Sequence, residues 1–157
     1  MPLIVWTDRM SVGVKLLDND HKKLVLLVNK LFDGVVAVGA RPALESVFEE
    51  LVDFTRLHFF HEERLLAETG YPDSAAHRHE HDQLLEQLME LQVHFAVSTE
   101  LANDLDVMNR LRVWLFKHTQ GADQEFVPHL KAKKVDSILA SWSTPYLVAR
   151  KRSAIQR

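Results

Sequence analysis

Four stretches of this 157-residue chain place apolar side chains on one face of a helix. Within 21–32, 44–65, 77–95 and 107–118 the apolar residues recur at intervals of three and four, the spacing of neighbours along one side of an α-helix. Such stripes must be buried against other elements, and the connections between the stretches are short. Gly and Pro are scarce, at five each, which disfavours a turn-rich β fold. The pattern predicts an all-α protein, an antiparallel up-down-up-down four-helix bundle with an N-terminal arm and a short C-terminal extension.

Capping and turn residues predict where these helices begin and end. We expect residues 1–18 to form an irregular arm, and Asp18 or Asn19 to cap a first helix that begins near Asp20. The later signals are Pro42 in the first turn of the second helix, Gly70-Tyr71-Pro72 after it, and Asp73 or Ser74 as the cap of the third. Pro128 limits any continuation of the fourth helix.

The chain contains no cysteine. Disulfides, thiolate nucleophiles and iron–sulfur clusters are therefore excluded, and any bound metal ion must take nitrogen and oxygen ligands. No apolar run approaches the ~20 residues that span a bilayer, so we predict no integral membrane segment. The first six residues lack the basic region and cleavage site of a signal peptide, and a cytoplasmic location is therefore expected.

Charge divides the chain into two parts. Residues 131–157 hold seven Lys or Arg and one acid, Asp136, so the first 130 residues hold 12 basic and 21 acidic groups. This acidic body repels nucleic acid, and we expect a domain over 1–130 followed by a basic extension over 131–157. The extension could contact an acidic protein or a membrane surface, although a solvated tail is the simpler interpretation. Its apolar stretch, 135–142, could add a helical turn that Pro145 ends.

Five histidines and two carboxylates fall at spacings that suit a buried two-metal site. They are His21 in the first stretch, His58 and Glu62 in the second, His77 and His81 in the third, and His118 with Asp123 at the end of the fourth. Residues spaced i, i+4 share one helix face, so packing of the four stripes would bring these side chains together. Seven ligands exceed the shell of one tetrahedral zinc but suit two metal ions bridged by the carboxylates. Imidazole with carboxylate fits iron.

The spacing of His118 and Asp123 is the least regular part of this pattern. Five residues apart, the two side chains diverge by about 140° on a regular α-helix. Gly121 lies between them, and a loosened turn there could bring Asp123 back toward the other ligands.

The ordered set of motifs resembles the hemerythrin family, in particular its single-domain bacterial members, the bacteriohemerythrins. All seven family ligand positions are filled by the expected residue type. The matching segments are Trp6 with Val12-Gly13, Asp20-His21-Lys22 with Leu24, His58-Phe59-Phe60-His61-Glu62-Glu63, Gly70-Tyr71-Pro72, His77 with His81, and Trp114-Leu115 with His118 and Asp123.

The resemblance implies reversible O2 binding at two non-haem iron ions with an oxo or hydroxo bridge, and no enzymatic activity. It assigns His77, His81 and His118 to one iron and His21 and His58 to the other, with Glu62 and Asp123 bridging. The second iron then keeps an open position for O2. A monomer is expected.

By matching position, the resemblance also implies an O2 pocket formed by Phe59, Trp114, Leu115 and Thr119. Such a pocket should be apolar so that it keeps water away from the bound gas. Thr119 departs from this expectation, since a bulky aliphatic residue would suit the position better.

Two alternatives use the same chain differently. A diiron enzyme with peroxidase-like or nitric oxide reductase activity would be favoured by a polar or open pocket near Thr119. A sensory or interaction module would act through the basic extension. The remaining four histidines are expected outside the site, with His61 and His79 on the surface, His94 at an edge, and His129 also away from the ligands.

Overall fold

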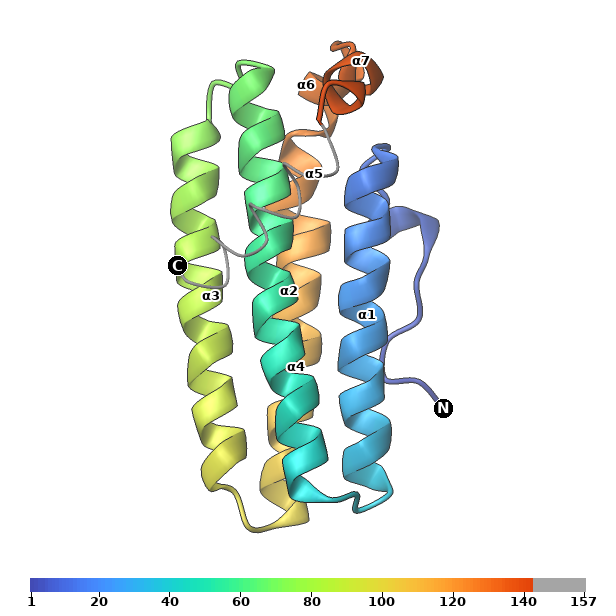
Figure 1. The fold of residues 1–157 in the computed structure, drawn as a ribbon, viewed down its shortest axis with the longest axis vertical. Coiled ribbons are helices and arrows are strands. Elements are labelled where there is room, and N and C mark those ends of the chain that lie inside the picture. Colours follow the sequence, from blue (N-terminus) through green and yellow to red (C-terminus); the bar gives the residue numbers. More distant parts are fainter. Residues whose placement is uncertain (143–157) are drawn as a thin grey trace.

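The computed structural model describes residues 1–142. The bundle has four long helices, each antiparallel to the next: α1 (Lys15–Val36), α2 (Arg41–Glu68), α3 (Ser74–Val97) and α4 (Leu101–Lys117) (Figure 1). Each packs against its neighbours in sequence, and α4 closes the bundle by packing against α1. The predicted all-α bundle is confirmed. Residues 143–157, which include Pro145 and four of the seven basic residues of the extension, lie outside the described part.

The first helix begins earlier than the sequence predicted. It starts at Lys15, and the carboxylate of Asp18 lies inside its first turn instead of capping it. The oxygens of Asp18 accept hydrogen bonds from the Ser11 hydroxyl at 2.6 Å and from the Val12 amide at 2.8 Å. The prediction of a cap at Asp18 or Asn19 was therefore wrong. Asp18 instead binds the N-terminal arm to the helix through these two hydrogen bonds.

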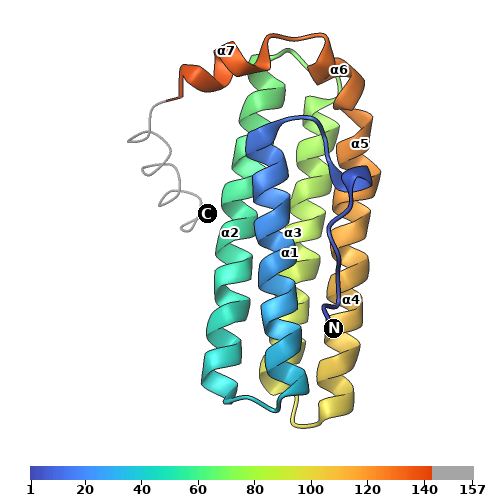
Figure 2. The same ribbon diagram turned by 90° about the vertical axis from the view of Figure 1, so that its right-hand side faces the viewer.

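The N-terminal arm is ordered by similar contacts along its length. It runs beside α1 (Figure 2) and contains a short 3₁₀ turn, Asp8–Met10. The side-chain amide of Asn29 accepts from the Ile4 amide at 2.9 Å and donates to the Ile4 carbonyl at 2.8 Å. Met10, the last residue of this turn, is fully buried and packs into the main core.

The turn between α2 and α3 follows the sequence prediction closely. The amides of Gly70 and Tyr71 donate to the carbonyls of Ala67 and Leu66, which satisfies the free carbonyls at the end of α2. Gly70 has a φ of +69°, a conformation that residues with a Cβ rarely adopt. Asp73 precedes the first residue of α3, although its side chain makes no capping hydrogen bond among the described residues.

Three short helices close the end of the bundle. They are α5 (Asp123–Glu125), α6 (Val127–Lys131, with Pro128 in its first turn) and α7 (Val135–Ala140). Figure 2 shows α6 and α7 lying across the tops of the long helices. Val135 and Trp142 are buried there against Leu17, Leu65 and Phe126. This smaller apolar cluster is separate from the main core, to which all four long helices contribute. The expected extra helical turn over 135–142 is confirmed.

None of the helices within residues 1–142 is long and apolar enough to cross a membrane.

Candidate metal centre

Seven buried side chains meet between the long helices, and together they form the candidate metal centre. They are His21 from α1, His58 and Glu62 from α2, His77 and His81 from α3, His118 from the turn after α4, and Asp123 from the start of α5. Because neighbouring helices run in opposite directions, the start of α1, the end of α2, the start of α3 and the end of α4 lie at the same level. The structure thus brings together all seven residues that the sequence singled out.

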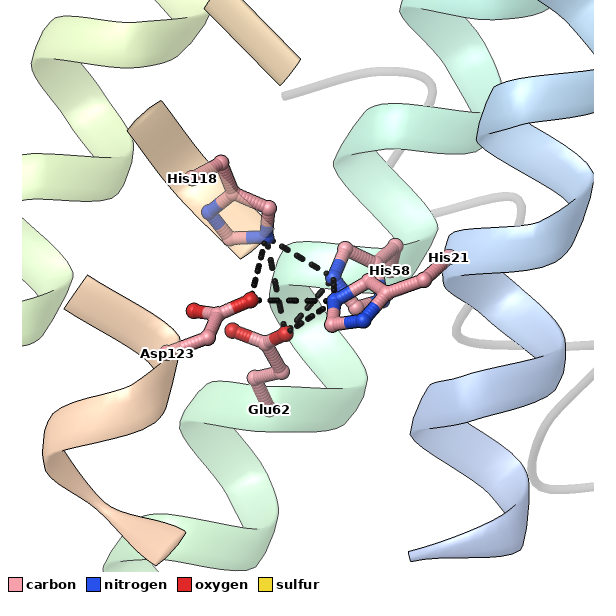
Figure 3. Close-up of side chains that lie close together, drawn as sticks. All are labelled: His21, His58, Glu62, His118 and Asp123. Carbon is pink, nitrogen blue, oxygen red and sulfur yellow. Dashed lines mark hydrogen bonds and ion pairs between the residues drawn. The ribbon is translucent and has the colours of Figure 1, made fainter. Parts of the chain in front are cut away.

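Five of these side chains form one tight group, shown in Figure 3. His58 Nε2 lies 2.9 Å from His21 Nε2 and 2.6 Å from Glu62 Oε1. His118 Nε2 lies 3.0 Å from His58 Nε2 and 2.9 Å from Asp123 Oδ2. Adjacent ligands of an octahedral ion with bonds of about 2.1 Å are separated by about 3 Å, so these distances suit ligands of a common ion.

A second group shares the same two carboxylates. Glu62 Oε2 lies 3.1 Å from His77 Nε2 and 3.0 Å from His81 Nε2, and Asp123 Oδ1 lies 3.5 Å from His77 Nε2. Each carboxylate therefore turns one oxygen toward the first group and the other oxygen toward the second. This is the arrangement that two bridged metal ions require.

The position of His118 differs from the one that the family resemblance implied. Its Nε2 lies with those of His21 and His58, whereas we expected it to pair with His77 and His81. The ring lies between the two sets, with its centroid 5.2 Å from that of His58 and 5.4 Å from that of His81. The division of the histidines between two ions thus stays a prediction.

A π-helical turn, His118–Ala122, directs Asp123 into the centre. The Asp123 amide donates to the His118 carbonyl, an i→i+5 hydrogen bond that widens the turn by one residue. The expected loosened turn is confirmed, but glycine is not sterically required for it. A Cβ added to Gly121 would meet no atom within 4 Å, and its φ lies outside the left-handed region.

The carboxylates of the centre are held ionised. Burial favours the neutral acid of Glu62, yet the charges of His58 and His118 hold its pKa well below the usual range. Burial also favours neutral Asp123, and the neighbouring Glu62 charge acts in the same direction. The charge and hydrogen bonding of His118 outweigh both and lower the Asp123 pKa.

The pKa values of two histidines of the centre are shifted upward by the charges of these carboxylates. Burial opposes the imidazolium form of His58, but the charge of Glu62 and hydrogen bonds to Asp20 and Glu62 raise its pKa to about 10. The charges of Asp123 and Glu62 overcome the same burial effect at His118 and raise its pKa to about 9. These buried carboxylates therefore require positive charge beside them, which either protons on the imidazoles or metal ions can supply.

The donor set fits two iron ions. Both carboxylate oxygens of Asp123 are fully buried, with His118 Nε2 at 2.9 Å from Oδ2 and His77 Nε2 at 3.5 Å from Oδ1. A buried carboxylate is costly unless positive charge reaches it, and a metal ion bound by those nitrogens would supply that charge. Histidine nitrogens and carboxylate oxygens, with no thiolate anywhere in the chain, are the ligands that iron accepts.

One histidine that was expected on the surface lies beside the centre. His61 is buried, and its Nδ1 donates to Asp20 Oδ2 at 2.7 Å, so its predicted exposure was wrong. The same carboxylate accepts a hydrogen bond from His58 Nδ1 at 3.0 Å. Burial raises the Asp20 pKa, but its hydrogen bonds to the two histidines lower it further than burial raises it. Two sequence features could have indicated this contact, namely the i, i+3 spacing of His58 and His61 and the position of Asp20 next to His21.

The other three histidines lie away from the centre. His79 and His94 are exposed, in agreement with their predicted positions. His129 is half-buried, and its Nε2 lies 3.0 Å from the Thr69 hydroxyl.

The four residues predicted to form the O2 pocket are all buried. The Phe59 ring stacks on His81 with centroids 3.9 Å apart, and the Trp114 indole donates to the Leu84 carbonyl at 2.8 Å. Leu115 is fully buried one helical turn before His118. The hydroxyl of Thr119 donates to the Leu115 carbonyl at 3.0 Å, so this polar group is already satisfied by the backbone.

The fold and the site together define a class of protein, a helical bundle with a buried histidine–carboxylate centre for metal ions. A family model described as the hemerythrin HHE cation binding domain matches residues 12–130. The chain belongs to the hemerythrin family.

Individual relatives support the same assignment. The chain is 33% identical over 132 residues to a bacteriohemerythrin of Stenotrophomonas maltophilia, covering 84% of each chain. It is 34% identical over 133 residues to one of Methylococcus capsulatus, covering 84% of this chain and 100% of the relative. A crystal structure of wild-type hemerythrin superimposes with a TM-score of 0.71 at 32% identity, covering 82% of this chain and 98% of that one.

Proposed function

We propose that this protein binds O2 reversibly at two iron ions held by the candidate metal centre. The observation that carries the proposal is the sharing of Glu62 and Asp123 between two groups of histidine nitrogens. A single metal ion would not need two carboxylates that each face both groups. The two groups of ligands would hold two ferrous ions, which would supply the two electrons that reversible O2 binding requires.

The side chains of the centre suit a binding role. Five imidazoles and two carboxylates occupy most of the coordination positions of two six-coordinate ions, which leaves little room for a substrate besides a small gas. Glu62 and Asp123 would bridge two ions, and both carboxylates are held in buried positions. His21 and His58 would hold the ion at which O2 binds.

Apolar side chains around the centre exclude water. Phe59 covers one face of His81, and its ring centroid lies 5.0 Å from that of His118. Leu115 is fully buried on the same side of the helix as His118. We propose that Phe59, Trp114, Leu115 and Thr119 form the O2 pocket, where few water molecules can deliver protons to the bound gas.

Thr119 bears on the alternative of a diiron enzyme with peroxidase-like or nitric oxide reductase activity. The sequence favoured that alternative only through the polar side chain at this position. Its hydroxyl is buried and donates to the Leu115 carbonyl, so it does not present a free polar group to a reactant. This contact supports a binding protein over an enzyme.

An optical experiment tests the proposal. The visible absorption spectrum of the iron-loaded, reduced protein is recorded before exposure to air, after exposure, and again after removal of O2. We expect a visible absorption band that appears with air and disappears on deoxygenation over repeated cycles.

A pair of matched variants provides the control. His77→Ala removes a ligand and should abolish the band and lower the iron content, whereas His79→Ala alters an exposed histidine on the same helix and should change neither. Irreversible oxidation at the first exposure of the native protein, or a single zinc ion per chain, would refute the proposed function.

A further inference from the structure

Asp20 lies between two histidines of α2, only one of which belongs to the candidate metal centre. Its Oδ2 accepts hydrogen bonds from His58 Nδ1 at 3.0 Å and from His61 Nδ1 at 2.7 Å. Asp20 is 6% exposed, His61 is 5% exposed and His58 is fully buried. An ionised carboxylate can only accept, so both Nδ1 atoms carry hydrogen. His58 is thereby fixed with its Nε2 directed into the centre.

The helices account for this three-residue contact. His58 and His61 are spaced i, i+3, so both rings project from the side of α2 that faces α1. Asp20 precedes His21 on α1, and its carboxylate reaches between those rings while His21 enters the centre. The packing of α1 against α2 thus places His58 in the centre and Asp20 behind it.

This support distinguishes His58 from the other two histidines of its group. Within residues 1–142, the Nδ1 atoms of His21 and His118 are buried without a hydrogen-bond partner. A carboxylate on the remote nitrogen of a ligating imidazole fixes its orientation and makes it a stronger donor. The centre is therefore asymmetric, with a negative charge placed behind only one histidine of this group.

The surroundings of His61 keep this contact away from water. The ring of Trp142 lies 6.3 Å from that of His61, and the Arg64 guanidinium stacks over Trp142 at 4.2 Å. The Trp142 indole is held by the Glu68 carboxylate at 3.0 Å. A hydrogen bond to a charged group is stronger where water is excluded, so the segment after α7 adds to the effect of Asp20.

We propose that Asp20, held by His61, is a positioning residue that strengthens His58 as a metal ligand and stabilises the more highly charged state of the ion bound there. The inference rests on the proposed function in that His58 binds one of the two ions. It goes beyond that function because it predicts an unequal pair of ions, tuned by residues that are not ligands.

Asp20→Asn tests the inference because it removes the charge and keeps the size of the side chain. We expect a chelator to remove metal about 10- to 100-fold faster than from the native protein, measured separately with iron and with Co²⁺. The reduction potential of the iron-loaded centre should also rise, since the ferric state loses a nearby negative charge. Asp20→Glu restores the carboxylate and should return the potential part of the way to the native value.

Asp104→Asn is the matched control. Asp104 is also a buried carboxylate, but it pairs with Arg41 at 2.8 Å at the opposite end of the bundle. Its replacement should lower stability and leave both the metal loss rate and the potential unchanged. These readouts separate a positioning role from a merely structural one.

Each remaining outcome has a definite meaning. Native rates and potential in Asp20→Asn would overturn the inference, and so would failure of that variant to fold in the presence of metal. Absence of reversible O2 binding in the native protein would instead refute the proposed function. The Co²⁺ loss rates would still decide the role of Asp20, because they involve no O2.

Discussion

Protons and metal ions compete for the same atoms at the residue scale. In the metal-free protein the pKa of His58 is raised to about 10 and that of His118 to about 9, in both cases by the buried carboxylates nearby. These imidazoles must give up protons before their Nε2 atoms can bind a metal ion. Metal uptake near neutral pH should therefore release protons, and metal affinity should fall as the pH is lowered.

The same groups predict how the stability of the metal-free protein depends on pH. A raised histidine pKa contributes stability that is complete below the ordinary value of 6.5 and is lost as the pH rises through the folded-state value. The free energy of unfolding should thus fall between pH 6.5 and about 10. Urea titrations of metal-free protein across this range measure it, with iron-loaded protein as the control that should change little. Equal stability at both ends would contradict the charge balance described for the centre.

Leu115 provides a second prediction at this scale. It is fully buried beside the proposed O2 pocket, so Leu115→Ala should cost about 2–5 kcal/mol of unfolding free energy and speed autoxidation by admitting water. Leu31→Ala is the control, because Leu31 is equally buried but lies about 15 Å along α1 from His21. It should lose similar stability with a native autoxidation rate. Both rates are measured well below the melting temperatures, and equal rates would show that Leu115 is ordinary core.

Some residues of the site could be predicted from the sequence and others could not. Six residues of the centre lie on apolar stripes at helical spacing, so bundle packing brings them together, whereas Asp123 enters through the π-helical turn. His61 lies off that stripe, and its burial depends on Asp20 of another helix and on Trp142, far away in the sequence. The i, i+3 spacing of His58 and His61 is a local signal that they share a helix side, but the apolar periodicity does not show which residues of other elements meet His61.

At the scale of the elements, two glycines that follow or interrupt helices have different roles. Gly70 ends α2 with φ at +69°, whereas Gly121 lies in the π-helical turn without a left-handed φ and with open space around its Cβ position. The end of α2 was predicted well because Gly70, with its positive φ, stops the helix. The start of α1 was missed because Asp18 suits a cap but bonds to the arm instead.

Alanine substitutions at these glycines should therefore have opposite effects. Gly121→Ala should stabilise the protein by about 0.4–1 kcal/mol, since it restricts the unfolded chain at no cost to the folded one. Gly70→Ala should destabilise it by about 1–2 kcal/mol because alanine is strained in the left-handed conformation. Urea unfolding measures both, and metal content should remain native in each variant. A loss of metal in Gly121→Ala would show that the turn needs glycine to place Asp123.

At the scale of the whole molecule, the bundle supplies the ligands and the C-terminal segment covers one end of it. All seven residues of the centre precede residue 124, and α7 with Trp142 packs over the end of α2. The acidic body and basic extension were evident from the sequence. The docking of 135–142 onto the bundle depends on matching apolar surfaces, which the sequence alone could only suggest.

Two nested truncations test this division. A chain that ends at Ala132 should keep its iron and reversible O2 binding but lose stability, by about 1.5–3 kcal/mol for the burial of Trp142 alone. A chain that ends at Trp142 keeps 133–142 and their contacts with the bundle, so a stability loss found only in the shorter chain belongs to those residues. Melting curves and oxygenated spectra measure both. Loss of O2 binding in the shorter chain, with iron still bound, would make the C-terminal segment part of the pocket.

The ratio of bound O2 to bound iron tests the central claim most directly. Iron is counted by elemental analysis, and O2 uptake and release are followed by titration of the same reduced sample. Two irons bridged by Glu62 and Asp123, of which one keeps an open position, predict two irons per chain and one O2 bound per iron pair, recovered on deoxygenation. One iron per chain, one O2 per iron, or O2 that is consumed and not returned would contradict the account.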